Sequence, residues 1–463
     1  MARNYGKTSD GRGLSRAATI ALIATIATTG FAWGIAQHVA RADESKETSA
    51  AQQLGLKSHG QGQLTQTVVT SRTGDELFGF DVDVQTEFGE CPDRRGKGYL
   101  GFRRAGGQLA LLGRVDPLAT PPVIGDGREA MVTFTPNCAT KQQAASPYNS
   151  KALERIRLLR GTLGHMPNAS TSLSAIAEPA HTTIAANRDG RLAVAWLAPH
   201  GRVGIGTEAT NQLYVSIGHT WGPMSTTQIV AGDSYATRVR LVWASSDELL
   251  VVYSVNKRVV VQAWKAGHGF GRPQTLGSCD FTSWGPDLTV AVGPGGRAAI
   301  AWGTQADTIE PQSPWRVYGI VRTGANARFE SSHLLDPGQA QNRVPGMYDG
   351  GPNDVTAGIG TDGFTMFAWS SAELAPGRGD PVHAAVVDPD GHFNSVQELA
   401  PVSTDVTLTE MPGGGTLLQW KASRELRQAS RAPDGQSFGP AGAGTASAGL
   451  IDGAELIDSA TGG

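Results

Sequence analysis

The chain has 463 residues, of which 40% are hydrophobic, so it is long enough to bury a sizeable core in about two to four domains or in one large repeat array. Charged residues make up only 17% of the chain, whereas 60 residues are glycine. This combination disfavours long helices, coiled coils and charge-rich disorder, and it favours an all-β protein with many turns.

The N-terminus has the pattern of an export signal. Four basic residues precede an uncharged run over 17–40, and the run ends in the Ala-Arg-Ala sequence of 40–42. A basic segment, an apolar run and an Ala-x-Ala site are typical of a secretory signal peptide, so we expect cleavage after Ala42 and secretion from the cell. The alternative is an uncleaved signal anchor that leaves the protein facing outside, because the run is about as long as a bilayer-spanning helix of roughly 20 residues.

Charge and cysteine spacing exclude several classes of partner. Without residues 1–42 the chain has 34 basic and 41 acidic residues, a net charge of −7, and no strong basic run remains. We therefore expect no nucleic-acid partner, and no membrane partner once the signal is cleaved. The three cysteines show no Cys-x-x-Cys or Cys–His spacing, so we expect no metal site and no cofactor.

Internal repeats dominate the rest of the sequence. Five windows of 16 residues align without gaps, each ends in an aromatic residue, and four carry Thr at the third and Gly at the tenth position. The same template fits 65–80, which ends at Phe80, and a weaker copy ends at Phe134. Repetition of this kind predicts one structural unit per copy. The five windows are 181–196, 238–253, 287–302, 354–369 and 405–420.

Each copy predicts a four-stranded antiparallel unit, with strands A to D. The window itself reads as strand A, a turn of Gly, Asp and Pro, and strand B. A further β-like run and a glycine-containing turn follow, which we assign to strands C and D. Residues 152–164 supply these strands for the second copy, although a helix begun by Ser146-Pro147 is the alternative there. The C–D turns of the later copies lead to the aromatic residues Trp221, Phe270, Phe329, Phe393 and Phe438.

Seven four-stranded units predict a β-propeller with seven blades, or with six if the weak copy is false. A two-domain β-sandwich would also have many short strands, but it would not repeat a gapless template. We expect the aromatic residues to pack in the core rather than to stack against sugars. The predicted organisation is a signal over 1–42, a linker over 43–64, the propeller over 65–445, and a tail over 446–463 that closes the ring or is disordered.

The pattern resembles secreted propeller proteins of bacteria, including the sialidase-like type, over essentially the whole mature chain. The turns at 388–393 and 433–438 are similar to the Asp box of that family, Ser-x-Asp-x-Gly-x-Thr-Trp, but they lack the residue between Asp and Gly. The Arg-Ile-Pro segment that supplies a carboxylate-binding arginine in that family is also missing. The resemblance therefore implies the propeller architecture without the catalytic signatures.

Strand polarity predicts where a ligand binds. In an antiparallel unit the short A–B and C–D turns lie at one end of the strands, which we name the turn face. The longer B–C and D–A loops lie at the opposite end, the loop face, and functional groups usually lie on such loops. Strand A begins at the loop face, so residues at its start should ring the mouth of the central channel. The candidate ligand-binding residues are Asp287, Asp354, Asp405, His181 and Arg238, together with Tyr348 in a neighbouring loop.

Such a ring fits a cation, a sugar or another small polar ligand, and acid–base chemistry if two carboxylates were close enough. The alternative is structural, because Asp and Thr side chains often accept hydrogen bonds from backbone N–H groups where a loop enters a strand. The same reasoning on polarity places Cys91 and Cys138 in the B–C loops of adjacent blades. We expect these two to form a disulfide and Cys279 to remain a thiol.

No catalytic motif accompanies these features. Gly-x-Ser-x-Gly, His-Glu-x-x-His and the P-loop are all missing from the sequence. We therefore expect an exported non-enzymatic propeller that acts as a binding or scaffold module, with a glycan or protein ligand on the loop face. The alternative is a glycan-active hydrolase or lyase with its site at the channel mouth. The sequence does not indicate an oligomeric state.

Overall fold

Seven antiparallel sheets make up the protein. A computed structural model describes residues 50–56, 64–71, 73–82, 97–136, 154–177, 181–200, 210–230, 236–279, 288–305, 315–336, 354–370, 381–400, 404–411, 414–422 and 425–444. The predicted signal over 1–42 and the tail over 446–463 lie outside these residues, as do most of the predicted loop-face connections. No helix in the described ranges is long and apolar enough to cross a membrane.

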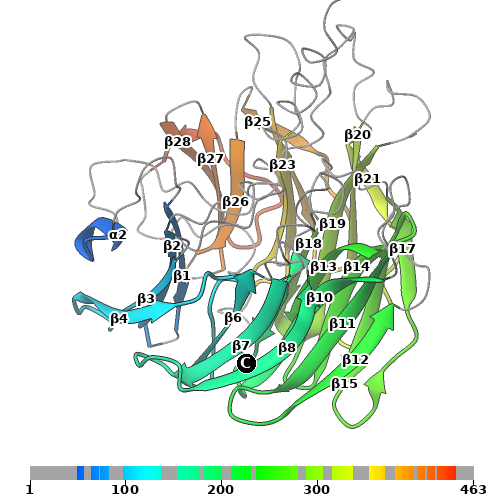
Figure 1. The fold of residues 1–463 in the computed structure, drawn as a ribbon. Coiled ribbons are helices and arrows are strands. Elements are labelled where there is room, and N and C mark those ends of the chain that lie inside the picture. Colours follow the sequence, from blue (N-terminus) through cyan, green and yellow to red (C-terminus); the bar gives the residue numbers. More distant parts are fainter. Residues whose placement is uncertain are drawn as a thin grey trace, which may run out of the picture.

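Each sheet is built from strands that are consecutive in the chain (Figure 1). The first three sheets contain β1 (Leu64–Thr70), β2 (Glu76–Val82), β3 (Lys97–Arg103) and β4 (Leu109–Val115); β5 (Val123–Gly125), β6 (Arg128–Pro136), β7 (Glu154–Thr162) and β8 (Ala169–Ala177); and β9 (Thr183–Ala186), β10 (Arg191–His200), β11 (Thr210–His219) and β12 (Met224–Val230). The fourth contains β13 (Ala236–Trp243), β14 (Glu248–Val255), β15 (Arg258–Lys265), β16 (Gly269–Phe270) and β17 (Gln274–Ser278).

The last three sheets follow the same plan. They contain β18 (Leu288–Gly293), β19 (Arg297–Gln305), β20 (Trp315–Arg322) and β21 (His333–Asp336); β22 (Asp354–Ile359), β23 (Thr365–Ser370), β24 (Val382–Val387) and β25 (Gln397–Ala400); and β26 (Thr404–Glu410), β27 (Thr416–Ala422), β28 (Glu425–Arg431) and β29 (Gly442–Ala443). These seven sheets confirm the weak second copy of the repeat, so the fold is a seven-bladed, all-β propeller.

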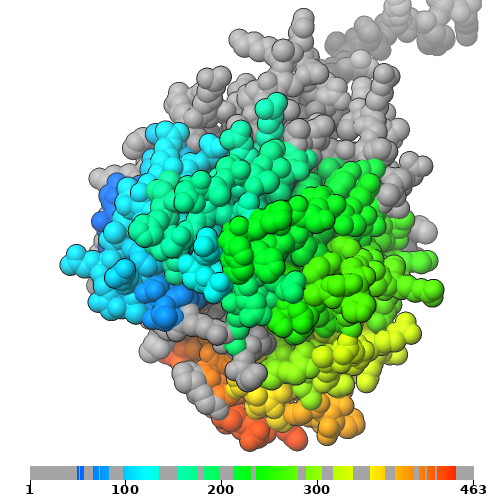
Figure 2. Space-filling model, turned by 90° about the horizontal axis from the view of Figure 1, so that it is seen from below, coloured from blue at the N-terminus to red at the C-terminus, as the bar shows by residue number. Residues whose placement is uncertain are grey.

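The blades follow one another around a ring. The first strands of successive sheets contact each other from β1 to β26, which makes them the innermost strands. Seen from below, the chain passes from blue through green and yellow to red around the molecule (Figure 2), which brings the last blade round to the side of the first. Each blade in the described residues is complete by itself, because no sheet combines strands from the two ends of the chain.

Alternation along strand B explains why the blades stack closely. In β19 the large side chains of Ile300 and Trp302 pack against blade 4, whereas Ala299 and Ala301 face blade 6 and leave room for the aromatic residues of that blade. Two-residue periodicity buries both faces of a strand in this way. The seven aromatic residues that end the repeat windows are all buried, which confirms their predicted role in packing: Phe80, Phe134, Trp196, Tyr253, Trp302, Trp369 and Trp420.

Three details differ from the expectations or extend them. Phe134 faces the following blade, packing with Trp196, although its counterparts in blades 3 to 7 face the preceding one; the second copy is therefore out of phase by one residue. Trp221 is 49% exposed, so the prediction that the aromatic residues are buried is wrong for this side chain. Strand D of blade 4 also continues into β17, which pairs with β15 as β16 does.

The junction between blades 7 and 1 differs from the others. Thr407, Gln419 and Gln428 lie in register across β26, β27 and β28, on the face opposite to the one that packs against blade 6. One polar atom of each side chain is buried without a hydrogen-bond partner among the described residues, namely Thr407 Oγ1, Gln419 Nε2 and Gln428 Oε1. The aromatic face of blade 1, formed by Phe78 and Phe80, packs instead on Ala51 of the short helix α2 (Ala50–Gln53). Among the described residues, the other six pairs of neighbouring blades each share an apolar cluster, whereas this side of blade 7 is polar.

Candidate functional site

The structure locates two of the predicted ligand-binding residues in detail. His181 lies two residues before β9 and Arg238 lies near the start of β13, and these two first strands contact each other. Both residues are partly buried, and the backbone N–H of Arg238 donates to Ser254 Oγ at 3.1 Å. His181 and Arg238 therefore sit at the loop-face ends of adjacent innermost strands.

The remaining predicted residues are described less fully. Asp354 begins β22 opposite Ser370, and Asp405 is the second residue of β26, so both occupy loop-face positions of innermost strands. The structure does not describe their carboxylates. Asp287 and Tyr348 lie outside the described residues, as do Cys91 and Cys138, so the charged ring and the disulfide stay predictions. Cys279 is a buried thiol beside the blade 4–5 core.

The turn face carries a set of charged contacts that sequence reasoning missed. Four blades have an arginine at or near the end of strand C, where the strand reaches the turn face, and these residues contact carboxylates or backbone carbonyl groups. The signal was available, because a basic residue ends the β-like run of strand C in each case. The four residues are Arg103, Arg160, Arg322 and Arg431.

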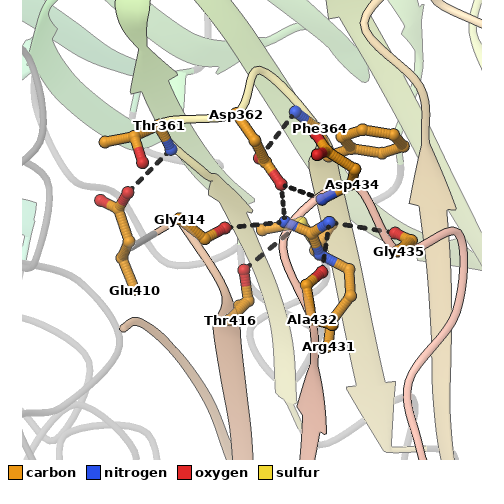
Figure 3. Close-up of polar contacts among 11 residues, drawn as sticks. Thr361, Asp362, Phe364, Glu410, Gly414, Thr416, Arg431, Ala432, Asp434 and Gly435 are labelled. Carbon is orange, nitrogen blue, oxygen red and sulfur yellow. Dashed lines mark hydrogen bonds and ion pairs between the residues drawn. The ribbon is translucent and has the colours of Figure 1, made fainter. Parts of the chain in front are cut away.

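Arg431 joins blade 7 to blade 6 (Figure 3). Its side chain is fully buried, and Nη2 donates to Asp362 Oδ2 at 2.7 Å while Nη1 donates to the carbonyl oxygen of Gly435 at 3.0 Å. The same carboxylate accepts a hydrogen bond from the backbone N–H of Asp434 at 3.1 Å. A buried guanidinium is stable only when paired and hydrogen-bonded, so this network fixes the two turns relative to each other.

The ion pair between blades 4 and 5 is built in the same manner. Arg322 Nη2 and Nη1 donate to the two carboxylate oxygens of Glu248 at 2.6 and 3.2 Å, and Nε donates to the carbonyl oxygen of Gly296 at 3.0 Å. Both side chains are almost inaccessible to solvent. Such bidentate geometry is specific for a guanidinium and a carboxylate, and it leaves no free charge for chemistry.

Two carboxyl groups have strongly raised pKa values. Burial raises the pKa of Glu129 to about 8, and the backbone N–H of Gly164 offsets this effect only in part. Desolvation likewise raises the pKa of Asp81 to about 7, although Asp81 Oδ1 accepts a hydrogen bond from the backbone N–H of Leu118. Glu129 lies at the turn-face end of β6 and Asp81 at the loop-face end of β2, so the two groups do not form a catalytic pair.

The turn at 388–393, which is similar to an Asp box, groups three residues able to bind a metal ion, Asp388, Asp390 and His392. Asp388 Oδ1 accepts hydrogen bonds from the backbone N–H groups of Asp390 and His392, at 2.9 and 2.8 Å, and Oδ2 lies 3.1 Å from His392 Nδ1. These hydrogen bonds lower the pKa of the Asp388 carboxyl. Both of its oxygens thus already stabilise the turn, which is the role of an aspartate in an Asx turn.

Comparisons with known proteins concern the fold alone. No family model matches the chain, and no curated protein matches it. Among solved structures, it is similar to the K499G mutant of NanB sialidase from Streptococcus pneumoniae, with 10% identity and a TM-score of 0.35, over 78% of this chain and 66% of that one. It is also similar to the Dos1 propeller (12%, TM-score 0.41, 83% and 86%) and to the α-L-arabinofuranosidase Arb93A from Fusarium graminearum (9%, 0.38, 79% and 91%).

Proposed function

We propose that the protein is an exported, non-enzymatic β-propeller that acts as a binding or scaffold module outside the cell. The observation that carries this proposal is that buried charged side chains in the described residues form ion pairs between neighbouring blades. The buried arginines Arg322 and Arg431 each hold a carboxylate of the preceding blade. Charged groups paired in this way make the ring of blades rigid and do not form a reactive centre, because a fixed partner already neutralises each of them.

The proposed ligand site lies on the loop face, over the ring formed by Asp287, Asp354, Asp405, His181 and Arg238. Support comes from the innermost position of the strands that begin with these residues, and from the concave mouth that such strands surround in a propeller. The ligand class is a glycan or a protein, since a ring of mixed charge offers both hydrogen-bond donors and acceptors.

The alternative function is that of a glycan-active hydrolase or lyase at the same mouth. Three blades begin strand A with aspartate, and glycoside hydrolysis needs two carboxyl groups about 5 to 10 Å apart. The described acids with raised pKa values, Asp81 and Glu129, do not provide such a pair.

A glycan array combined with activity assays on the same panel separates the two functions. Binding without turnover supports the module, whereas turnover that disappears in Asp354→Asn would establish the enzyme. Export is tested independently by N-terminal sequencing of protein from the culture medium. A chain that starts at Asp43 is expected, and an intact Met1 in the membrane fraction would indicate a signal anchor instead.

A further inference from the structure

Trp221 breaks the rule that the other blades follow for the aromatic residue near the C–D turn. Phe329 and Phe438 are buried, and Phe270 and Phe393 are partly buried, yet the larger indole of Trp221 is 49% exposed. Exposing a large aromatic side chain forgoes the stabilisation that its burial would give. The exposure of Trp221 is therefore a departure from the repeat that the other blades with an aromatic residue at this turn do not share.

The turn that carries Trp221 is rigid. The backbone N–H of Thr220 donates to the carbonyl oxygen of Gly190 at 2.8 Å, which joins the C–D turn to the A–B turn of the same blade. Arg160 of blade 2 donates to the carbonyl oxygens of His219 and Gly222, on either side of Trp221. The backbone on both sides of Trp221 is thus held by hydrogen bonds, so that little backbone freedom would be lost when a ligand binds.

The position of the indole depends on a glycine. Gly190 has a φ of +72°, and a Cβ atom there would lie 2.0 Å from Cζ3 of Trp221 and 2.6 Å from Cη2. A side chain at this position would push the ring away. The absence of one lets the six-membered ring lie directly on the backbone of the A–B turn while about half of the residue faces solvent.

Polar side chains lie over and next to the exposed ring. The guanidinium carbon of Arg128 lies 5.8 Å from the ring centroid, and the imidazole of His219 lies 5.0 Å from it, tilted by 33°. The Cβ atom of Asp126 is 3.1 Å from the same Cβ position at Gly190 that the indole overlies. Arg128 and Asp126 are both exposed and carry opposite charges, so the site offers donors and acceptors with no net charge between them.

We propose that Trp221, Arg128, Asp126 and His219 form a binding site for a neutral pyranoside on the turn face, between blades 2 and 3. The indole supplies a flat apolar surface for the C–H face of the sugar ring, and the guanidinium and carboxylate bind its hydroxyl groups. Because the charges of Arg128 and Asp126 offset each other, the site has no net charge that would select an ionic ligand. This site is distinct from the loop-face site of the proposed function and does not depend on it.

The test uses NMR saturation transfer with methyl β-galactoside and methyl β-glucoside on the full mature protein. We expect binding of at least one of them on the order of 1 mM, a range usual for a small ligand with few contacts. Trp221→Ala should weaken this binding at least tenfold, and Trp221→Phe should retain part of it. Leu334→Ala, a change at a side chain of similar exposure (47%), is the matched control and should bind like the wild type.

Because Trp221 also covers Gly190, Arg128→Ala provides a second variant that removes only an exposed side chain. We expect it to weaken binding without a change in melting temperature, while Asp354→Asn leaves saccharide binding unchanged. The proposal is overturned if neither saccharide binds, or if Trp221→Ala and Arg128→Ala both bind as the wild type does. Loss of binding in Asp354→Asn alone would place the saccharide on the loop face and would likewise overturn it.

Discussion

Glu248 of blade 4 and Arg322 of blade 5 form an ion pair, with Oε2 and Nη2 2.6 Å apart, inside a junction that solvent hardly reaches. Glu248 begins strand B of its blade and Arg322 ends strand C of the next. The pair therefore joins neighbouring blades at the turn face, at the point where each sheet is furthest from the loops that we expect to bind the ligand.

Removing one member of this pair should destabilise the protein. Glu248→Ala leaves the guanidinium of Arg322 buried without its counter-charge, and a loss of about 3 to 5 kcal/mol in the free energy of unfolding is expected. Denaturant melts measure this quantity. Glu425→Ala, which removes the exposed partner of Arg427, is the control and should cost less than about 1 kcal/mol. Similar losses in the two variants would mean that the buried pair has no special role.

Trp302 should be among the most important apolar side chains. It is fully buried between blades 4 and 5, stacks on Tyr318 with ring centroids 5.6 Å apart, and donates from Nε1 to the carbonyl oxygen of Ser278 at 3.1 Å. Trp302→Ala should lower the free energy of unfolding by about 3 to 5 kcal/mol. A loss below about 1 kcal/mol in denaturant melts would contradict the packing described between these blades.

Ionisation of Glu129 should make the protein less stable at alkaline pH. Its pKa in the folded protein is about 8, above the ordinary value of 4.5, so the folded state holds the proton more tightly than the unfolded state. The stabilisation from this proton is complete below pH 4.5 and is lost as the pH rises to about 8. Asp81 acts with the same sign between pH 3.8 and about 7.

Glu129→Gln isolates this effect, because an amide resembles the protonated carboxyl group but does not ionise. The variant should gain stability relative to the wild type as the pH is raised from 5 to 9, and melting temperatures across that range measure the difference. Since Asp81 is present in both proteins, its titration cancels. A difference that does not change with pH would show that Glu129 ionises without penalty in the folded protein.

The sequence predicts the repeat better than the exceptions to it. Gapless windows that end in buried aromatic residues, such as Trp302 and Trp369, predicted the blades because each blade packs an aromatic side chain of strand B into the core in the same way. The exposure of Trp221 could not be predicted in this way, since it depends on Gly190 and on Arg160 of another blade. The ion pair between Glu248 and Arg322 could not be predicted either, because the two residues are 74 positions apart and no repeat window contains both.

The cysteines provide a test of the order of the blades. Cys91 and Cys138 are predicted to lie in the B–C loops of blades 1 and 2, and a disulfide between them should contribute roughly 3 to 4 kcal/mol in the chain-entropy picture. Peptide mapping of the non-reduced protein should find these two linked. A bond from Cys279 to either one would contradict the prediction, and it would also be difficult to form because Cys279 is buried in the blade 4–5 core.

The central claim, a ligand site over the loop-face ring, is tested most directly by the affinity of Asp354→Asn for a glycan or protein ligand of the wild type. If the ring binds the ligand through charge, this change should weaken binding at least tenfold, about 1.4 kcal/mol, with little effect on melting. Asp390→Asn on the turn face should bind as the wild type does. Unchanged binding in Asp354→Asn, with a loss of at most about 1 to 2 kcal/mol in stability, would mean that the aspartates only support the strands. Equal loss of binding in the two variants would contradict the assignment of the ligand to the loop face.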